Sequence, residues 1–244
     1  GVGGFAKVLI ALAAAATLAL GADYFTTTKE QRFEFPVLIA LATLYNRSAD
    51  YESSFRHFTL AGQTYNGDTV FAISLLNNLG TTLLRDERPE RALPLYRRAS
   101  ALSRQIGAGD FDMLIQQNLA TALINSENLV EAEQVLQNIS QDLGTDQPLR
   151  NAEFWRAQAT ISIERGQTEV AENQIARALA AINPESSDPN LRFVHAIAYR
   201  IFSSAGRPQD ALAQLEQLRR IEEIDERLTS SNRASLIRAR FQMD

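Results

Sequence analysis

Small residues recur along the chain at a nearly constant spacing, each at the same point of a similar amphipathic segment. They are Ser54, Ala92, Ala132, Ala171 and Ala211. The period is therefore about 40 residues, which is typical of arrays of helix pairs. Apolar residues around each of these positions follow the three- and four-residue steps of one helix face. The pattern predicts an all-α chain whose successive helix pairs bury their apolar sides in one continuous core.

The most regular unit covers residues 73–104 and is predicted to form two helices joined by a turn at residues 86–89. Small and large apolar residues share one side of each predicted helix: Leu76, Leu79, Gly80 and Leu83 on the first, and Ala92, Tyr96 and Ala99 on the second. Pro89 suits the start of the second helix, where its missing amide hydrogen costs little.

This arrangement resembles the tetratricopeptide repeat, which has Leu-Gly in its first helix and Ala, an aromatic residue and Ala in its second. The resemblance extends over five units and implies a right-handed solenoid of about five such helix pairs in residues 35–228. Gln116 and His195 depart from the usual apolar types. Gly166 and Gly206 each precede the small residue of their unit by five positions, so we expect them in the turns. A HEAT or armadillo array is the alternative.

The chain begins with an apolar run at residues 2–22, in which Lys7 is the one charged residue. A helix of this length spans about 30 Å, the thickness of the hydrocarbon layer. We therefore expect a membrane anchor in residues 1–24, a linker in residues 25–34 and a single-pass protein of the mitochondrial or bacterial inner membrane. Because Lys7 lies near the start and Asp23 follows the run, the repeats should face the intermembrane or periplasmic side. A signal sequence and a helix packed on a partner protein are the alternatives.

The end of the chain is predicted to cap the array. Ile221 and Leu228 continue an apolar stripe beyond the last unit, and Ser230 or Ser231 is suited to begin a final basic helix. We therefore expect a capping helix within residues 229–244, since a terminal helix commonly shields the exposed end of a solenoid.

The charged and chemically reactive residues exclude several classes of function. With 24 basic and 29 acidic residues the net charge is −5, so the chain lacks the basic footprint that nucleic acid requires. It has no cysteine, and its two histidines, His57 and His195, lie in different predicted units. We therefore predict no catalytic, metal or cofactor site, and we expect His195 to be a core or interface histidine. The chain is not expected to be an enzyme.

The resemblance also implies a binding surface, because in this family the first helix of each unit lines a concave face on which peptides dock. The residues that correspond by position are Ile39, Thr43, Asn46, Asn77, Thr81, Leu84, Gln117, Thr121, Ile124, Arg156, Thr160, Ile163 and Arg200. They are mostly amide, hydroxyl and aliphatic. Only Asn77 and Arg156 suggest the clamp that some family members use for a chaperone's terminal carboxylate, so a chaperone adaptor is disfavoured. The face suits an extended or helical segment of another protein.

Together these features predict a non-enzymatic, membrane-tethered scaffold that serves as a subunit or assembly factor of a larger membrane complex. A respiratory complex is a candidate, because some 40 residues resemble a mitochondrial inner-membrane tetratricopeptide factor associated with the cytochrome bc1 complex. The resemblance is carried by Thr81-Thr82-Leu83, Arg98-Ala99-Ser100, Arg104-Gln105-Ile106 and Asn118-Leu119-Ala120. The alternatives are a periplasm-facing adaptor of a bacterial envelope and a receptor subunit that captures a peptide tail.

Overall fold

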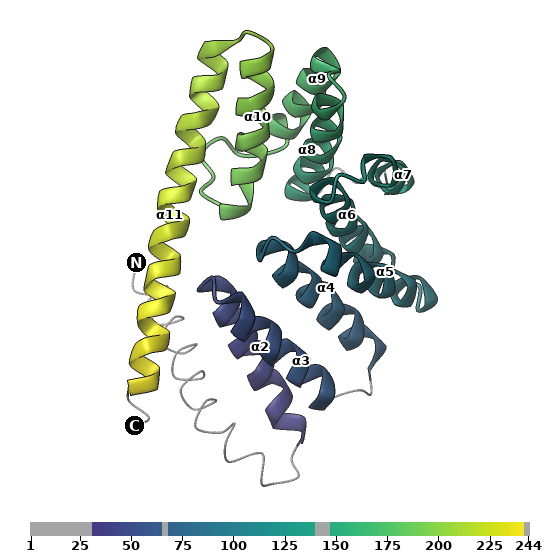
Figure 1. The fold of residues 1–244 in the computed structure, drawn as a ribbon, viewed down its shortest axis with the longest axis vertical. Coiled ribbons are helices and arrows are strands. Elements are labelled where there is room, and N and C mark those ends of the chain that lie inside the picture. The colour runs from purple at the N-terminus through teal and green to yellow at the C-terminus, as the bar shows by residue number, and fades with distance from the viewer. Residues whose placement is uncertain (1–30, 65–67, 140–146, 242–244) are drawn as a thin grey trace. The chain divides into compact units, whose positions relative to one another are not determined.

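The computed structural model describes residues 31–64, 68–139 and 147–241, which form helices joined by short connections (Figure 1). No strand occurs in these ranges, so the all-α prediction is confirmed for them. The chain divides into two compact units. Unit 1 comprises the described parts of Gly1–Glu87 and Arg227–Asp244, and unit 2 comprises those of Arg88–Glu226.

The helices follow one another in pairs along the chain. Unit 1 contains α2 (Gln31–Arg47), α3 (Tyr51–Thr64), α4 (Thr69–Arg85) and the last part of α11 (Pro208–Phe241). Unit 2 contains α5 (Pro89–Gln105), α6 (Gly109–Asn125), α7 (Leu129–Ile139), α8 (Pro148–Glu164), α9 (Thr168–Ala180), the 3₁₀ helix η2 (Pro189–Leu191), α10 (Arg192–Ser204) and the first part of α11.

Within unit 2 the helices stack as the repeat pattern predicts. α6 packs against α5 and α7, α8 packs against α9, and α10 packs against both α8 and α9. The first helices of successive pairs, α6, α8 and α10, also contact one another in that order (Figure 1). Each pair therefore covers the apolar side of the next pair, which is how a repeat protein builds its core.

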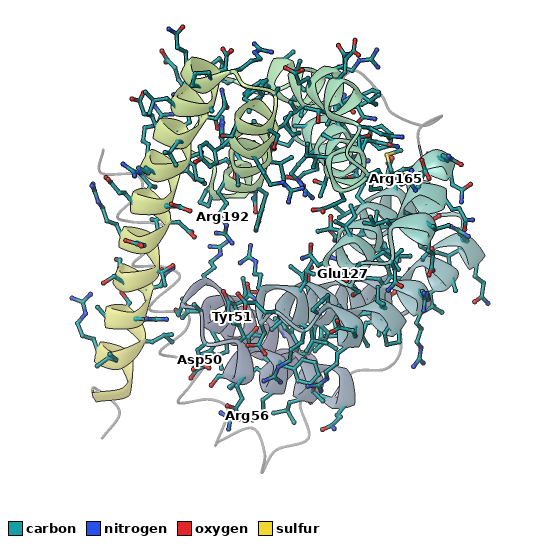
Figure 2. The ribbon with its side chains drawn as sticks, turned by 45° about the horizontal axis from the view of Figure 1, so that its top comes forward. Asp50, Tyr51, Arg56, Glu127, Arg165 and Arg192 are labelled. Carbon is teal, nitrogen blue, oxygen red and sulfur yellow. The ribbon has the colours of Figure 1, made fainter. Side chains whose placement is uncertain are left out.

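The turns between the two helices of the described pairs share one feature of backbone conformation. A residue with positive φ lies five positions before each recurring small residue: Ala49 (55°), Glu87 (56°), Glu127 (60°), Gly166 (72°) and Gly206 (71°). In the turn after α8 the amide of Gln167 donates to the carbonyl of Ser162 at 2.9 Å, the bond that closes a Schellman motif. The turn positions predicted for Gly166 and Gly206 are confirmed, and Glu127 occupies the same position between α6 and α7 (Figure 2).

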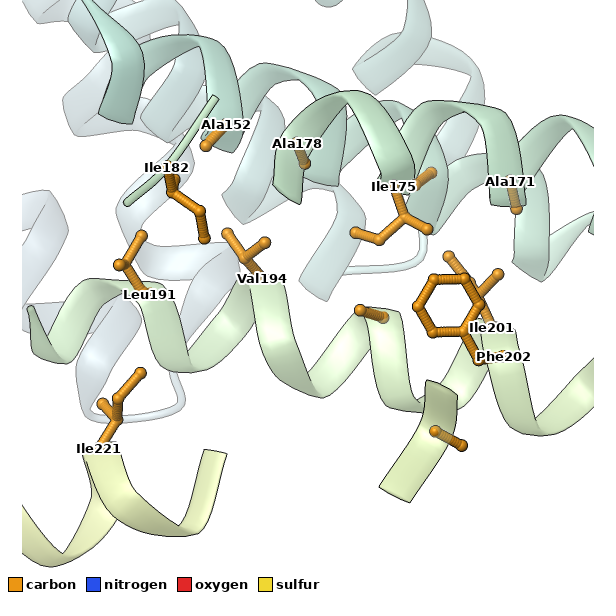
Figure 3. Packing of buried hydrophobic residues seen from close by; sticks show 13 residues of the cluster. Ala152, Ala171, Ile175, Ala178, Ile182, Leu191, Val194, Ile201, Phe202 and Ile221 are labelled. Atoms are coloured by element: carbon orange, nitrogen blue, oxygen red, sulfur yellow. The ribbon is translucent and has the colours of Figure 1, made fainter. Parts of the chain in front are cut away.

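The recurring small residues mark the packing contacts of the helices. All five are buried, which explains why a small residue recurs at this spacing along the chain. In unit 2 the helices α8 to α11 share a core in which Ile175, Val194 and Ile201 are among the fully buried side chains (Figure 3). Complete burial of one such aliphatic side chain contributes about 1.5–3 kcal/mol relative to exposure.

The last helix differs from the prediction. α11 runs without interruption from Pro208 to Phe241, so no new helix begins at Ser230 or Ser231. The sequence after Pro208 contains neither glycine nor proline to stop the helix. In unit 1 the Nε of Arg233 donates to the carbonyl oxygen of Ser48 at 2.7 Å. This contact satisfies a carbonyl just beyond the end of α2, where a cation is also electrostatically favourable.

One expectation is contradicted by these helices. None of those in the described ranges is long and apolar enough to cross a lipid bilayer, so the predicted single-pass localisation in a mitochondrial or bacterial inner membrane is wrong. Residues 2–22, on which the expectation was based, and residues 25–30 of the predicted linker lie outside the described residues. Residues 31–34 of that linker form the start of α2.

Candidate protein-binding face

The first helices of unit 2 bring together part of the predicted binding face. Arg156 of α8 donates from Nη2 to Oγ1 of Thr121 on α6 at 3.1 Å. Its Nε forms an ion pair with Oε2 of Glu153 at 2.8 Å. Arg156 is buried, and its guanidinium already has two partners within the unit. It therefore joins neighbouring first helices and is not an open ligand for a partner's carboxylate.

A second polar link joins the same two helices. The side chain of Gln117 on α6 is buried and donates from Nε2 to the backbone carbonyl of Arg150 on α8 at 2.9 Å. Thr160 is also buried, and its hydroxyl bonds to the carbonyl of Arg156 one turn earlier in the same helix. These predicted site residues consequently hold the face rigid.

The remaining predicted residues of unit 2 lie apart from these links. Arg200 of α10 is exposed and pairs through Nη2 with Oε1 of Glu164 on α8 at 2.7 Å. Ile124 and Ile163 are partly buried near the ends of α6 and α8. Arg200 thus ties α10 to α8 through a carboxylate that the sequence analysis did not single out.

In unit 1 the predicted face is organised around Asn46. Its Nδ2 donates to Oγ1 of Thr82 on α4 at 3.0 Å, and its Oδ1 accepts from Nη1 of Arg85 at 2.8 Å. The hydroxyls of Thr43 and Thr81 bond to carbonyls of their own helices, those of Ile39 and Asn77 respectively. Leu84 is partly buried. Asn46 thereby joins the two first helices α2 and α4.

Sequence reasoning missed two large apolar side chains on the same first helices. Leu114 of α6 is 39% exposed and Phe193 of α10 is 48% exposed. Both occupy the repeat position that Glu153 occupies on α8, about one turn before Gln117 and its equivalents. Extending the predicted face by one turn toward the start of each helix, at the same period, would have found them.

Phe193 is held in place despite its exposure. The guanidinium carbon of Arg192 lies 4.5 Å from the centre of the Phe193 ring, a cation–π contact. Nη1 of Arg192 is in turn fixed by Oδ2 of Asp225 on α11 at 2.7 Å (Figure 2 labels Arg192). The ring is therefore an exposed apolar group on a rigid support.

The two departures from the repeat pattern are satisfied by local hydrogen bonds. Buried Gln116 donates to Oγ of Ser100 on α5 at 2.6 Å, and Ser100 donates to Oδ1 of Asp112 at 2.6 Å. His195 is buried, and its Nδ1 lies 2.8 Å from Oε1 of Gln214 on α11. Burial lowers the pKa of His195, an effect that the Gln214 hydrogen bond opposes. The prediction of a core histidine is confirmed.

Ion pairs on the surface join other helices of unit 2. Arg165, in the turn after α8, makes a two-pronged contact with the carboxylate of Glu133 on α7 at 3.0 and 2.8 Å (Figure 2 labels Arg165). The hydrogen bond from Arg165 lowers the pKa of Glu133. Within the described ranges no group of three or more His, Asp and Glu residues is placed to hold a metal ion.

Comparison with known proteins identifies the type of repeat. The family model of the tetratricopeptide repeat matches residues 75–108, which cover most of α4 and all of α5. The fold is similar to that of BtubC (BKLC) from P. vanneervenii, with 20% identity, a TM-score of 0.62 and coverage of 87% of this chain and 90% of that chain. It is also similar to a putative kinesin light chain with nearly identical TPR-like repeats from Podosopora anserina, at 18% identity and a TM-score of 0.54, covering 80% and 97%.

These similarities establish the fold, an all-helical TPR-like repeat protein. A comparison with curated protein sequences finds no significant match. The expected resemblance to the mitochondrial factor associated with the cytochrome bc1 complex is not supported by any of these comparisons.

Proposed function

We propose that this TPR-like repeat protein is a non-enzymatic scaffold that binds a segment of another protein on the first helices of unit 2, α6, α8 and α10. The observation that carries the proposal is the exposed ring of Phe193, supported by the paired guanidinium of Arg192. Aromatic side chains on rigid supports are the residues that most often dominate protein–protein binding energies.

The surrounding face is suited to this role because its polar groups are already engaged. The links from Arg156 to Thr121 and from Gln117 to α8 fix the spacing of the first helices. A partner therefore meets a surface that needs little ordering on binding, which reduces the entropy lost. Leu114, at the same repeat position as Phe193, supplies a second apolar contact.

The geometry changes how the face should be tested. Their repeat positions suggest Asn77 and Arg156 as ligands for a peptide tail, but Arg156 is buried and bonded to Glu153 and Thr121. Its removal would disturb the fold as well as binding. Phe193 and Leu114 are better probes, because substitution of a partly exposed side chain leaves the core intact.

The experiment is purification of the tagged protein with its partners from the source cells, followed by binding assays with the purified components. Phe193→Asp and Leu114→Asp should each weaken partner binding at least about tenfold. Leu212→Asp is the matched control, since Leu212 is 56% exposed on the second helix α11. A partner that binds the Phe193→Asp and Leu114→Asp variants normally would refute this assignment.

The same purification separates the roles that the sequence suggests. Several subunits recovered in fixed proportion indicate a scaffold of a larger assembly. A single partner whose binding is reproduced by its terminal peptide indicates a receptor for a tail. In both cases, partner binding must be weakened by substitution of Phe193 if the proposed face is correct.

A further inference from the structure

Arg150 is an arginine in an unfavourable position. It is the third residue of α8 (Pro148–Glu164), where the positive end of the helix dipole disfavours a cation. Its side chain is half-buried. The guanidinium Nη1 donates to the thioether sulfur of Met113 on α6 at 3.3 Å, and a thioether is a weak acceptor without charge.

The other arginines that are shielded from solvent are paired. Among the residues that the structure describes, Arg150, Arg156 and Arg192 are the arginines classed as buried or half-buried. Arg156 is bonded to Glu153 and Arg192 to Asp225. Arg150 has no carboxylate within ion-pair distance in the described residues. A partly desolvated guanidinium without a counter-ion is costly, and such local violations concentrate at functional sites.

Large apolar side chains are exposed on the same two helices. Leu149, the residue before Arg150, is 46% exposed. On α6, Phe111 and Leu114 are also exposed, and they lie one turn apart on the helix that carries Met113. We call these five residues, Phe111, Met113, Leu114, Leu149 and Arg150, the Arg150 patch.

We propose that the Arg150 patch binds a protein segment in which a side-chain carboxylate lies between large apolar residues. The carboxylate pairs with Arg150, which has no counter-ion among the described residues, through the two parallel hydrogen bonds that a guanidinium offers. The apolar side chains of the segment cover those of the patch. This inference rests on the proposed function, since it specifies the chemistry of the segment that the first helices hold.

The test is selection of a phage-displayed random peptide library on the purified full-length protein and on an Arg150→Gln variant. Peptides selected on the unchanged protein should be enriched in Asp or Glu flanked by large apolar residues, and the Arg150→Gln variant should lose the acidic preference. Arg98→Gln, which removes an exposed arginine of α5 and the same charge, should keep it. The best peptide should then bind about tenfold more weakly when its acidic residue is changed to the amide.

Selection without acidic enrichment, or failure to select any peptide, would overturn the inference. Equal loss of binding by the acidic peptide and its amide form on the Arg150→Gln protein would also overturn it, because that result indicates a general change in the fold. An Arg150→Leu variant gives a second measurement, since an apolar residue in place of a half-buried charge that has no carboxylate partner in the described ranges should not unfold the protein. The proposed function is judged separately, by the effect of Phe193→Asp on the natural partner.

Discussion

Arg156 on α8 donates a hydrogen bond to the hydroxyl of Thr121 on α6 over 3.1 Å. Both residues occupy positions that face ligands in the resembled repeat family, yet here they bind each other. The bond joins successive first helices, so these side chains contribute to the stability of the array. Their repeat position alone does not distinguish this role from ligand binding.

Substitution of Arg156 should therefore destabilise the fold. We expect Arg156→Ala to lower the free energy of unfolding by about 1–3 kcal/mol, because it removes buried contacts and leaves Glu153 without its partner. Thr121→Val removes one hydrogen bond and should cost about 0.5–1.5 kcal/mol. Urea denaturation of the purified variants measures both. An Arg156→Ala protein as stable as the unchanged one would contradict this structural role.

The turn after α8 provides a test of backbone strain. Gly166 has a φ of 72° and open space around its α-carbon, so the effect of an added methyl group is conformational. Gly166→Ala should lower the free energy of unfolding by about 1 kcal/mol. Gly109→Ala is the control, because Gly109 also has open space but no positive φ. The prediction fails if thermal or urea unfolding shows equal effects of the two substitutions.

The contact of Glu133 with Arg165 should be visible in a titration. Because the hydrogen bond lowers the pKa of Glu133 in the folded state, its stabilising effect is present above the unfolded-state pKa and is lost as the pH falls through the folded-state pKa. Arg165→Gln should raise the Glu133 pKa toward its ordinary value, as followed by NMR. The change in stability should be small, since both side chains are partly exposed to solvent.

Arg97→Gln is the control for that titration. Arg97 pairs with a different carboxylate of the same helix, that of Glu131. The Arg97→Gln substitution should leave the pKa of Glu133 unchanged. A Glu133 pKa that shifts equally in the two variants would show that general charge, and not the two-pronged contact, sets its value.

His195 should make the stability of the fold depend on pH. Since burial lowers its folded-state pKa, the unfolded chain takes up a proton first as the pH falls below about 6.5. Stability contributed by the neutral histidine should therefore decline from that pH until the folded-state pKa is passed. Urea denaturation between mildly acidic and neutral pH should show this slope, and His195→Gln should reduce it. The prediction is contradicted if the pH dependence of stability persists in the His195→Gln variant but disappears in the His57→Gln variant.

The repeat organisation was predictable because small residues at a fixed period are a local feature of the sequence. Ala132 and Ala171 must be small wherever the neighbouring helix lies, since the helices meet at these points. The turn geometry was only partly predictable. A glycine such as Gly166 indicates a positive φ in the sequence, but Glu127 adopts the same conformation although it is not a glycine. Packing of the flanking helices overrides the local preference of Glu127 for negative φ.

The details of the binding face depend on tertiary contacts that periodicity does not encode. Arg156 can be buried because its guanidinium bonds to Glu153 in its own helix and to Thr121 in another. The single long α11 shows a local signal that is overridden by its context. Ser230 and Ser231 resemble the start of a helix, but no residue before them ends the preceding helix. Serine favours a cap only where the chain is already free to leave the helix.

The shared turn conformation has a consequence for how such a chain changes length. Because a residue with positive φ lies at the same point between the two helices of each described pair, the chain reverses through the same local conformation in successive pairs. The segment from one of these turns to the next is therefore a unit that can be duplicated, deleted or exchanged while the turns at its two ends keep the same conformation. Evolution and protein engineering can both use these junctions to extend or shorten the array.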